Sequence, residues 1–460
     1  MADLQLTGKR VIVVGAARSG LAAADLLVGR GARVTLADVR PDLPEAAGLE
    51  VRGIEVRLGP HDADRFAAAD LIVLSPGVPL RQPALDRAAR AGVPIIGEVE
   101  LASRLLRGRV IAITGTKGKS TTTTLVGRML AAAGLCGTVA GNIGSPLSAR
   151  VEASTDDTIH VVEVSSFQLE TTVAFHPWIA ALLNLSADHL DRHASLGEYA
   201  QAKARVFANQ GDGDWAVVNA DDGPAMDLAA RAARAPRWLF ALDAPVGVGT
   251  VLEGGWIVER GAGGDALPIL PVDEVRLIGR HLLADVAAAA AVARLAGVAP
   301  EAIRRAVSGF TGLEHALEPV MTVAGIRFVN DSKATNVESA RRAIESFDGR
   351  LVPIIGGRFK GGNLRDLRPA LRGRSTAVIA IGDARPAVRE ALGDMLAVIE
   401  ADSMAAAVRA ALAAAPPGGT VLLAPACASF DMFRDYAERG RVFKREVARL
   451  AEELGGGRES

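Results

Sequence analysis

Short apolar runs recur along this chain, and most of them end on a glycine or on small polar residues before a helix-forming segment begins. The runs lie at residues 11–14, 34–37, 71–74, 110–113, 159–164, 179–185, 325–329, 352–355, 377–381 and 421–424. Buried parallel strands have this pattern, because helices cover both faces of their sheet. The repeated alternation of such strands with helices predicts an α/β fold.

Residues 114–121, Thr-Gly-Thr-Lys-Gly-Lys-Ser-Thr, directly follow the run at 110–113 and precede an amphipathic helix. Backbone N–H groups in such a glycine turn bind phosphate at the start of a helix. Lys119 supplies a positive charge for the β- and γ-phosphates, and Ser120 supplies a hydroxyl for Mg²⁺. The two glycines are separated by two residues where the standard motif has four. The pattern is therefore a variant Walker A motif, and it predicts binding of a nucleoside triphosphate.

The strands fall into three successive blocks, and 460 residues are enough for about three domains with separate cores. We expect three open-sheet domains. They are a Rossmann-like domain over residues 1–98, a central P-loop ATPase-like domain over 99–311, and a second Rossmann-like domain over 312–460.

Acidic residues at the ends of two strands in the central block indicate a metal site beside the glycine turn. Glu163 lies near the end of one strand, where a carboxylate faces the phosphates and coordinates Mg²⁺. The run at 179–185 leads to Asp188-His189-Leu190-Asp191, where the flanking acids favour a ligand role for His189. Lys203 lies in a predicted helix over 199–207, and its position alone would place it on a solvated face.

The turn after the first strand is a weaker signal. Residues 15–20, Gly-Ala-Ala-Arg-Ser-Gly, have alanine in place of the glycine that lets a backbone approach a pyrophosphate closely. A dinucleotide site and a purely structural turn both remain open for this block. Residues 75–79, Ser-Pro-Gly-Val-Pro, form another loop at the carboxyl end of a strand, where ligands bind in open α/β sheets.

The composition indicates which kinds of partner and which cellular compartment to expect. The net charge is −1, so no overall basic field favours nucleic acid, and the partners are expected to be small molecules. Cys136 and Cys427 have neither the number nor the spacing of a disulfide framework or a zinc site. The Ala-rich segment 282–298 contains Asp285 and Arg294, so we expect no membrane insertion. Without an apolar leader in residues 1–10, we expect a cytoplasmic protein, and we expect a monomer.

Five segments resemble the motifs of the Mur ligases of peptidoglycan synthesis. They are Gly-Thr-Lys-Gly-Lys-Ser at 115–120, Glu-Val-Ser-Ser-Phe-Gln-Leu-Glu at 163–170, Asp-His-Leu-Asp at 188–191, Asn-Asp-Ser-Lys-Ala-Thr-Asn at 330–336 and Ser-Phe-Asp-Met-Phe at 429–433. The resemblance extends from the first strand to about Glu452. The segments at 163–170 and 330–336 are most similar to the members that add glutamate to UDP-N-acetylmuramoyl-L-alanine. In such enzymes the first domain holds UDP rather than NAD, which is compatible with Ala17.

The resemblance implies an ATP-dependent ligase that forms an acyl phosphate on the UDP-linked carboxylate, which the amine of glutamate then displaces. It also implies two Mg²⁺ ions and CO₂, the latter bound as a carbamate on Lys203. The implied catalytic residues are Lys119, Glu163, His189 and Lys203, and the implied metal ligands are Ser120, Glu163, His189 and the Lys203 carbamate.

The remaining implied contacts fall into three groups. Those to ATP are Gly115, Thr116, Lys117, Gly118, Lys119, Ser120, Thr121, Asp285, His315 and Asp331. Those to the UDP-linked substrate are Gly15, Ser19, Asp38, Arg40, Gly77, Asn142, Ser165 and Gln168. Those to glutamate are Lys333, Thr335, Lys360, Ser429 and Tyr436.

Two segments depart from the family pattern. The chain has His315-Ala316 where the family has His-Arg, and residues 281–285 read His-Leu-Leu-Ala-Asp where the family has His-Asn-x-x-Asn. The family's arginine and asparagines contact the nucleotide. These changes therefore predict weaker ATP binding unless another cation, such as Arg280 or Arg342, replaces the missing groups.

Alternative functions remain open at this point. An NAD(P) oxidoreductase would use the first block but would leave the glycine turn at 115–118 without a role. A degenerate P-loop protein that only binds its ligand fits the departures. Folylpolyglutamate synthase shares the central and C-terminal plan but lacks a UDP-binding first domain. The sequence does not distinguish D-glutamate from L-glutamate, because both present the same charges.

Overall fold

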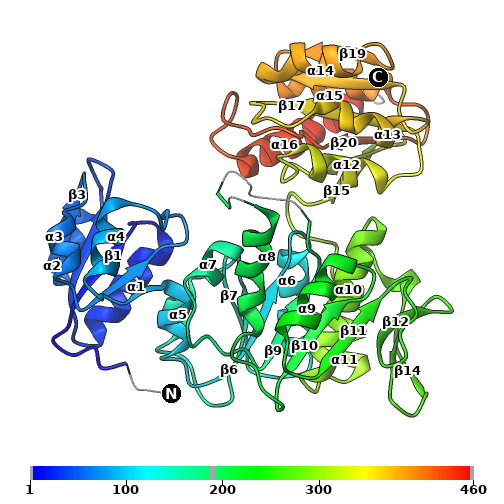
Figure 1. Cartoon of the computed structure of the whole chain (residues 1–460). Helices are drawn as coiled ribbons and strands as arrows, with labels where there is room; N and C mark the ends of the chain where they lie inside the picture. The colour runs from blue at the N-terminus through cyan, green and yellow to red at the C-terminus, as the bar shows by residue number, and fades with distance from the viewer. Residues whose placement is uncertain (1–3, 187–191, 194, 456–460) are drawn as a thin grey trace. The chain divides into compact units, whose positions relative to one another are not determined.

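The computed structural model describes residues 4–186, 192–193 and 195–455, and it contains three open sheets with helices packed on their faces (Figure 1). The predicted α/β class with three successive sheets is confirmed. The apolar runs form the strands because each lies in a sheet that is covered on both sides.

The first sheet has the order β3-β2-β1-β4-β5, and all of its pairs are parallel. Its strands are β1 Arg10–Val14, β2 Arg33–Asp38, β3 Ile54–Leu58, β4 Leu71–Leu74 and β5 Ile95–Gly97. The helices of this part are α1 Arg18–Gly29, α2 Ala46–Val51, α3 Ala63–Ala67, α4 Pro83–Arg90 and α5 Glu98–Ser103. The strand order reverses beside β1, so the loops after β1 and β4 open on one crevice.

The central sheet has the order β14-β13-β12-β11-β10-β9-β6-β8-β7. Its strands are β6 Arg109–Thr114, β7 Gly137–Gly141, β8 Ile159–Glu163, β9 Ile179–Leu182, β10 Trp215–Asn219, β11 Arg237–Ala241, β12 Gly249–Glu253, β13 Trp256–Arg260 and β14 Ala266–Pro271. The helices are α6 Lys119–Ala132, α7 Ser166–Glu170, α8 Leu196–Ala204, α9 Gly223–Ala232, α10 Arg280–Leu295 and α11 Pro300–Ser308. The apolar run at 179–185 gives a shorter strand than predicted, because β9 ends at Leu182. The pairs β12–β13 and β13–β14 are antiparallel.

The third sheet has the order β15-β16-β20-β17-β18-β19, with only the β15–β16 pair antiparallel. Its strands are β15 Glu318–Val323, β16 Ile326–Asn330, β17 Leu351–Gly356, β18 Ala377–Ile381, β19 Ala397–Ala401 and β20 Thr420–Leu423. The helices are α12 Val337–Glu345, α13 Arg368–Leu371, α14 Arg385–Leu392, α15 Met404–Ala414 and α16 Tyr436–Gly455.

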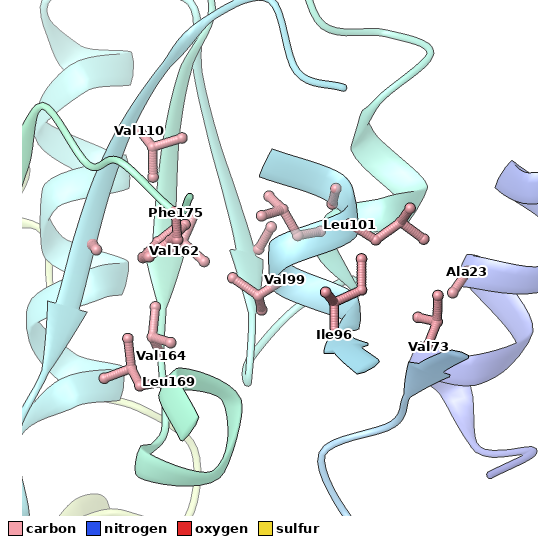
Figure 2. Close-up of a cluster of buried hydrophobic side chains, with 14 of the residues drawn as sticks. Ala23, Val73, Ile96, Val99, Leu101, Val110, Val162, Val164, Leu169 and Phe175 are labelled. Atoms are coloured by element: carbon pink, nitrogen blue, oxygen red, sulfur yellow. The ribbon is translucent and has the colours of Figure 1, made fainter. Parts of the chain in front are cut away.

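The chain forms two compact units. The first comprises Met1–Val275 with Ala284–Gly309, and the second comprises Arg276–Leu283 with Phe310–Ser460. A buried apolar cluster in the first unit includes Val73 of β4, Val99 of α5 and Val162 of β8 (Figure 2). The domain boundaries expected near residues 98 and 312 stay a prediction.

Within the described residues, no helix has the length and hydropathy needed to cross a membrane. Most of the Ala-rich segment 282–298 lies in helix α10, whose residues 286–293 are buried.

We expect Gly20→Ala to destabilise the first unit. A Cβ at Gly20 would overlap the carbonyl oxygen of Gly15 and lie 2.6 Å from Ser75 Oγ, so α1 would have to move away from the turn. Overpacking of this kind lowers the free energy of unfolding by about 1–3 kcal/mol. Gly29→Ala in the same helix is the matched control, because nothing lies within 4 Å of its added methyl. Urea unfolding of the two variants should separate them, and equal midpoints would contradict this packing.

Candidate active site

The glycine turn at 115–118 connects β6 to α6 in the geometry of a phosphate-binding loop. Gly118 precedes the first residue of α6 with a φ of 85°, a left-handed conformation that favours glycine. Lys119 folds back over the turn, and its Nζ donates to the carbonyl oxygens of Gly115 and Thr116, both at 2.9 Å. A phosphate would offer this ammonium group a stronger, charged acceptor.

Asn184 holds the turn from the loop after β9, and the sequence analysis did not identify it. Its side-chain Oδ1 accepts from the backbone N–H of Lys117 at 2.8 Å, and its Nδ2 donates to the carbonyl of Lys117 at 3.0 Å. Thr116 is bonded to the same loop, because its N–H donates to the carbonyl of Asn184 at 3.1 Å. A polar residue within the otherwise apolar run at 179–185 was the available signal.

Glu163 ends β8, which pairs in parallel with β6, and it is buried. Its Oε1 accepts from Asn142 Nδ2 at 2.7 Å, while its Oε2 has no hydrogen-bond partner among the residues that the structure describes. A buried carboxylate oxygen without a donor fits a divalent cation, which would compensate its charge. Of the other implied metal ligands, His189 lies outside the described residues. In the described part of the chain, no three His, Cys, Asp or Glu side chains gather as a metal site.

Lys203 is buried against the glycine turn rather than solvated, so the interpretation from position alone was wrong. Its side chain projects from α8, and its Nζ donates to the carbonyl of Gly115 at 2.8 Å and to Thr114 Oγ1 at 3.4 Å. The ammonium group also lies 4.6 Å from the ring centre of Tyr199, one helical turn earlier. Tyr199 in turn donates from its hydroxyl to Thr116 Oγ1 at 3.2 Å. Two side chains of α8 therefore contact the phosphate-binding loop and stabilise it.

Asp285 of α10 lies beside the same loop. A Cβ placed at Gly118 would overlap Asp285 Oδ1, so glycine is required there for space as well as for conformation. Asp285 is buried, and the structure places a carboxylate where the family pattern has an amide.

The residues implied for the UDP-linked substrate lie at the carboxyl ends of strands, in both sheets of the first unit. Asp38 ends β2 and accepts from the N–H of Ala16 at 2.6 Å and from Arg40 Nε at 3.0 Å. Partial burial of Asp38 opposes ionisation, but the hydrogen bonds from Arg40 and Ala16 prevail and lower its pKa to about 2. The carbonyl of Gly77 accepts from Arg192 Nη1 at 3.2 Å.

Other members of this set have roles in local structure. Ser165 and Gln168 form a capping box at the start of α7, in which each side chain bonds the other residue's backbone. Ser19 lies in the first turn of α1, directly after the Gly15 turn. Their contacts to a substrate stay a prediction.

In the second unit, the five residues implied for glutamate follow three adjacent strands. Lys333 and Thr335 come after β16, Lys360 comes after β17, and Ser429 and Tyr436 come after β20. Since these strands are parallel, their carboxyl ends share one edge of the sheet. The Lys360 ammonium group lies 5.4 Å from the ring centre of Phe430, which brings the loops after β17 and β20 together.

Arg439 of α16 binds the loops at this edge. It was not predicted, because an arginine in a helix is usually exposed to solvent. It is 1% exposed, and its guanidinium donates to Ser332 Oγ at 2.9 Å, to the Ser332 carbonyl at 2.9 Å and to the Cys427 carbonyl at 3.1 Å. Burial lowers the pKa of Arg439 to about 10. The loops after β16 and β20 are thus bound to one cation.

His315 and Asp331, both implied for ATP, lie in the second unit and are buried. Asp331 Oδ1 accepts from the N–H of Leu317 at 3.1 Å. Leu282, where the family has asparagine, is 8% exposed and belongs to the apolar cluster of this unit. Arg342, suggested as a replacement cation, donates to Glu338 Oε1 at 2.9 Å.

Three family models match the chain in order. They are the MurD-like N-terminal domain of Mur ligases over residues 9–97, the Mur ligase middle domain over 113–293, and the Mur ligase glutamate ligase domain over 315–427. The chain belongs to the Mur ligase family.

Relatives within the Mur ligase family match nearly the whole chain. A UDP-N-acetylmuramoylalanine–D-glutamate ligase of Acidobacterium capsulatum is 48% identical over 448 residues, covering 96% of both chains. An enzyme of the same name from Koribacter versatilis is 44% identical over 453 residues, covering 98% of this chain and 99% of its own. Among solved structures, UDP-N-acetylmuramate-alanine ligase MurC from Thermotoga maritima has the same fold, with a TM-score of 0.59 at 19% identity, over 96% of this chain and 99% of its own.

We expect Asp331→Asn to change how stability depends on pH. Burial raises the pKa of Asp331 to about 7, against the lowering effects of the Leu317 N–H and Lys333. The folded state thus binds a proton that the unfolded state releases near pH 4, and stability falls between about pH 4 and pH 7. Asparagine keeps the acceptor oxygen but does not titrate. The variant should therefore gain stability relative to the wild type as pH rises from about 5 to 8.

Hydrogen exchange at the amides of β16 and β20 measures this difference locally. Asp38→Asn, followed at the amides of β1 and β2 in the first unit, is the control of opposite sign. Its native pKa of about 2 means that the stability it supplies is complete above about pH 4 and is lost only as pH falls toward 2. Its difference from the wild type should stay constant between about pH 5 and 8. A constant difference for Asp331→Asn as well would contradict the raised pKa.

Proposed function

We propose that this chain is an ATP-dependent ligase that joins D-glutamate to the terminal carboxylate of UDP-N-acetylmuramoyl-L-alanine, in the synthesis of peptidoglycan precursors. The support is the phosphate-binding loop at 115–118 with buried Glu163 and Lys203 beside it, on a chain whose relatives carry this name along nearly their full length. The cytoplasm is the proposed compartment, and a monomer the proposed state.

The electrostatic problem of the reaction explains the need for this loop. A carboxylate must attack the γ-phosphate of ATP, and both groups are anionic, so their approach is unfavourable until positive charge compensates them. The backbone N–H groups of residues 115–118 and the ammonium group of Lys119 would hold the phosphates. The attack forms an acyl phosphate and releases ADP. The amine of glutamate then adds to the acyl carbon, and phosphate leaves through a tetrahedral intermediate.

The residues around the loop fit the implied Mg²⁺. Glu163, with one oxygen lacking a donor among the described residues, and Ser120, at the start of α6, would hold the cation. When bound, Mg²⁺ would neutralise charge on the phosphate oxygens. A second ion with His189 and a carbamate on Lys203 complete the proposed set. Burial favours the neutral amine that reacts with CO₂, and Lys203 is 1% exposed.

The other implied contacts are proposals of the same kind. The loops after β1, β2 and β4 would bind UDP through Gly15, Asp38 and Gly77, and Asn142 would position the substrate. The edge formed by Lys333, Thr335, Lys360, Ser429 and Tyr436 would bind glutamate. Two ammonium groups beside a dicarboxylate are electrostatically complementary.

Phosphate release from ATP, measured with UDP-N-acetylmuramoyl-L-alanine and each glutamate enantiomer, tests the proposal. We expect turnover that requires both acceptor and donor, with D-glutamate as the amine. Turnover with L-glutamate alone would keep the ligase chemistry but overturn the enantiomer. ATP binding by calorimetry without turnover under any combination would instead support a degenerate P-loop protein.

Lys203→Ala should lose nearly all turnover and remain folded. If the residue carries a carbamate, small carboxylic acids such as acetate should restore part of the activity by supplying the missing oxygens. Lys117→Ala is the control for loss of a positive charge near the loop, and added carboxylates should not rescue it. Wild-type rates in Lys203→Ala, or full loss without rescue, would contradict the carbamate.

A further inference from the structure

The segment 314–318 has a strained backbone. His315 has a φ of 66° and Leu317 has a φ of 44°, both in the left-handed region that residues with side chains rarely adopt. Such strain persists only where the surroundings enforce it, and it accumulates at functional sites. The segment therefore needs an explanation beyond connecting α11 to β15.

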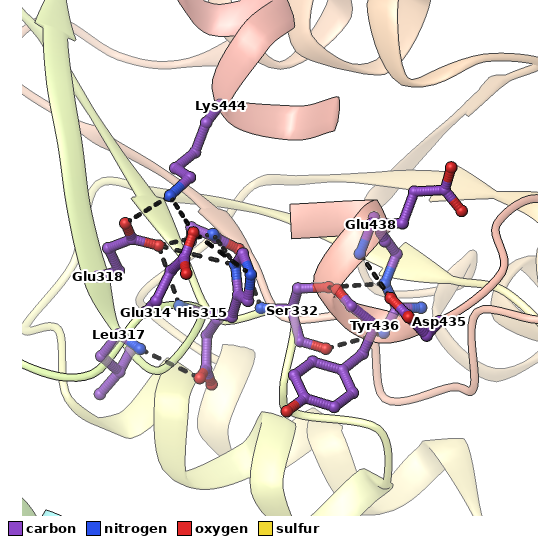
Figure 3. Close-up of polar contacts among 12 residues, drawn as sticks. Glu314, His315, Leu317, Glu318, Ser332, Asp435, Tyr436, Glu438 and Lys444 are labelled. Carbon is purple, nitrogen blue, oxygen red and sulfur yellow. Dashed lines mark hydrogen bonds and ion pairs between the residues drawn. The ribbon is translucent and has the colours of Figure 1, made fainter. Parts of the chain in front are cut away.

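Two carboxyl groups enforce this conformation by accepting hydrogen bonds from the backbone N–H groups of the strained residues. Glu318 Oε2 accepts from the N–H of His315 at 2.9 Å, and Asp331 Oδ1 accepts from the N–H of Leu317 at 3.1 Å. The carbonyl of His315 accepts from the N–H of Lys333 at 3.0 Å, in the loop implied for glutamate. Figure 3 shows His315 held between Glu318 and the loop that contains Ser332.

The amide of Asn330 fixes the protonation of the His315 ring. Asn330 Oδ1 accepts from the N–H of Ser332 at 3.1 Å, so its Nδ2 is the group that faces Glu318 Oε2 and His315 Nδ1, each at 2.9 Å. An amide NH₂ only donates, so Nδ1 must be an acceptor and the ring proton must be on Nε2. Only one tautomer satisfies this network.

The Nε2–H group is buried and available. His315 is 3% exposed, and within the described residues its Nε2 has no hydrogen-bond partner. Glu314 Oε1 lies 3.6 Å away, beyond hydrogen-bond distance. The ring packs edge-on to Tyr436, with centres 6.1 Å apart, and against Gly440, where any Cβ would overlap Nδ1. A buried donor without an acceptor is unfavourable unless a ligand supplies one.

Burial favours the neutral ring, although two carboxylates lie beside it. Burial lowers the pKa of His315, while the carboxylates of Glu314 and Glu318 act in the opposite direction and Arg441 and Lys444 reinforce the lowering. Lys444 of α16 bonds both carboxylates, Glu314 at 2.7 Å and Glu318 at 2.8 Å (Figure 3). It therefore offsets their attraction for a second ring proton.

We propose that Glu318 and Asn330 are positioning residues that hold His315 in its left-handed conformation as the neutral Nε2–H tautomer, so that Nε2–H donates to a phosphate oxygen of the substrate. The donation to phosphate rests on the proposed function. The tautomer rests on the hydrogen bonds alone. Ala316 makes this donor more important, because the adjacent arginine of the family is absent.

Nitrogen NMR of the full chain with ¹⁵N-labelled histidine, near neutral pH, tests the tautomer. His315→Gln assigns the signal by removing it. We expect the wild-type ring to have its proton on Nε2. Asn330→Asp replaces the donor with an acceptor, so the ring should become the Nδ1–H tautomer or doubly protonated. A wild-type ring with its proton on Nδ1, or an unchanged tautomer in Asn330→Asp, would overturn the proposal.

Steady-state kinetics of Glu318 variants test the positioning role. Glu318→Leu should raise KM for ATP by about 10-fold or more with a smaller change in kcat, because the donor loses its orientation. Glu318→Gln retains an acceptor oxygen and should preserve both the tautomer and KM. Glu453→Leu is the control on α16, since Glu453 is likewise a carboxylate paired with cations, here Arg409 and Arg449. It should leave KM unchanged.

The two claims fail separately. The Nε2–H tautomer without any ligase activity in the wild type would overturn the proposed function and with it the phosphate acceptor, but not the tautomer. The Nε2–H tautomer with an unchanged KM in a folded Glu318→Leu would overturn the donor role while the ligase proposal stands. If Glu318→Leu does not fold, a KM for Asn330→Asp equal to that of the wild type overturns the donor role instead.

Discussion

One carbonyl oxygen, that of Gly115, is the acceptor for two lysine ammonium groups. Lys119 reaches it from α6 at 2.9 Å and Lys203 reaches it from α8 at 2.8 Å. The positions of the two helices relative to β6 are thereby coupled at a single atom. When Lys119 turns toward a stronger anionic acceptor, the unmodified Lys203 keeps the oxygen, so the loop retains one anchor before a carbamate forms. The rest of the central site is arranged around this shared contact.

Buried apolar runs such as 110–113 predicted ten of the strands, because these runs contain little besides apolar residues. No predicted run covers the parallel strands β3, β5, β7, β10, β11 and β19. The sequence analysis also did not identify the antiparallel edge β12–β14. Those strands are short, and several of their residues, including Trp256 and Leu267, are exposed, so no continuous apolar run marks them. Strand ends were also uncertain, as β9 shows, because Leu183 and Leu185 continue the apolar pattern after its pairing stops.

Site residues could be predicted where they belong to a local sequence motif. They could not be predicted where their role depends on how distant elements pack together. The loop at 115–118 has a local motif, and the structure builds it as predicted. Lys203 has no local signal, since a lysine on a helix of mixed polarity reads as solvated until α8 is packed against β6. Arg439 is of the same kind, because it reaches the backbone carbonyl of Ser332, which is distant in sequence. Glu318 reaches the N–H of His315, which is close in sequence, but no local pattern marks that contact. The substrate contacts themselves remain predictions.

The buried guanidinium of Arg439 has a consequence for the order of folding. Every element of the first unit is complete by residue 309, so the phosphate-binding loop can form while the remainder of the chain is still being synthesised. The loops after β16 and β20, in contrast, are joined by a side chain from α16, the last helix of the chain. The edge of the third sheet is therefore finished last. In a nascent chain, the phosphate-binding loop would form early. The loops at the edge of the third sheet would be joined only when synthesis is nearly complete.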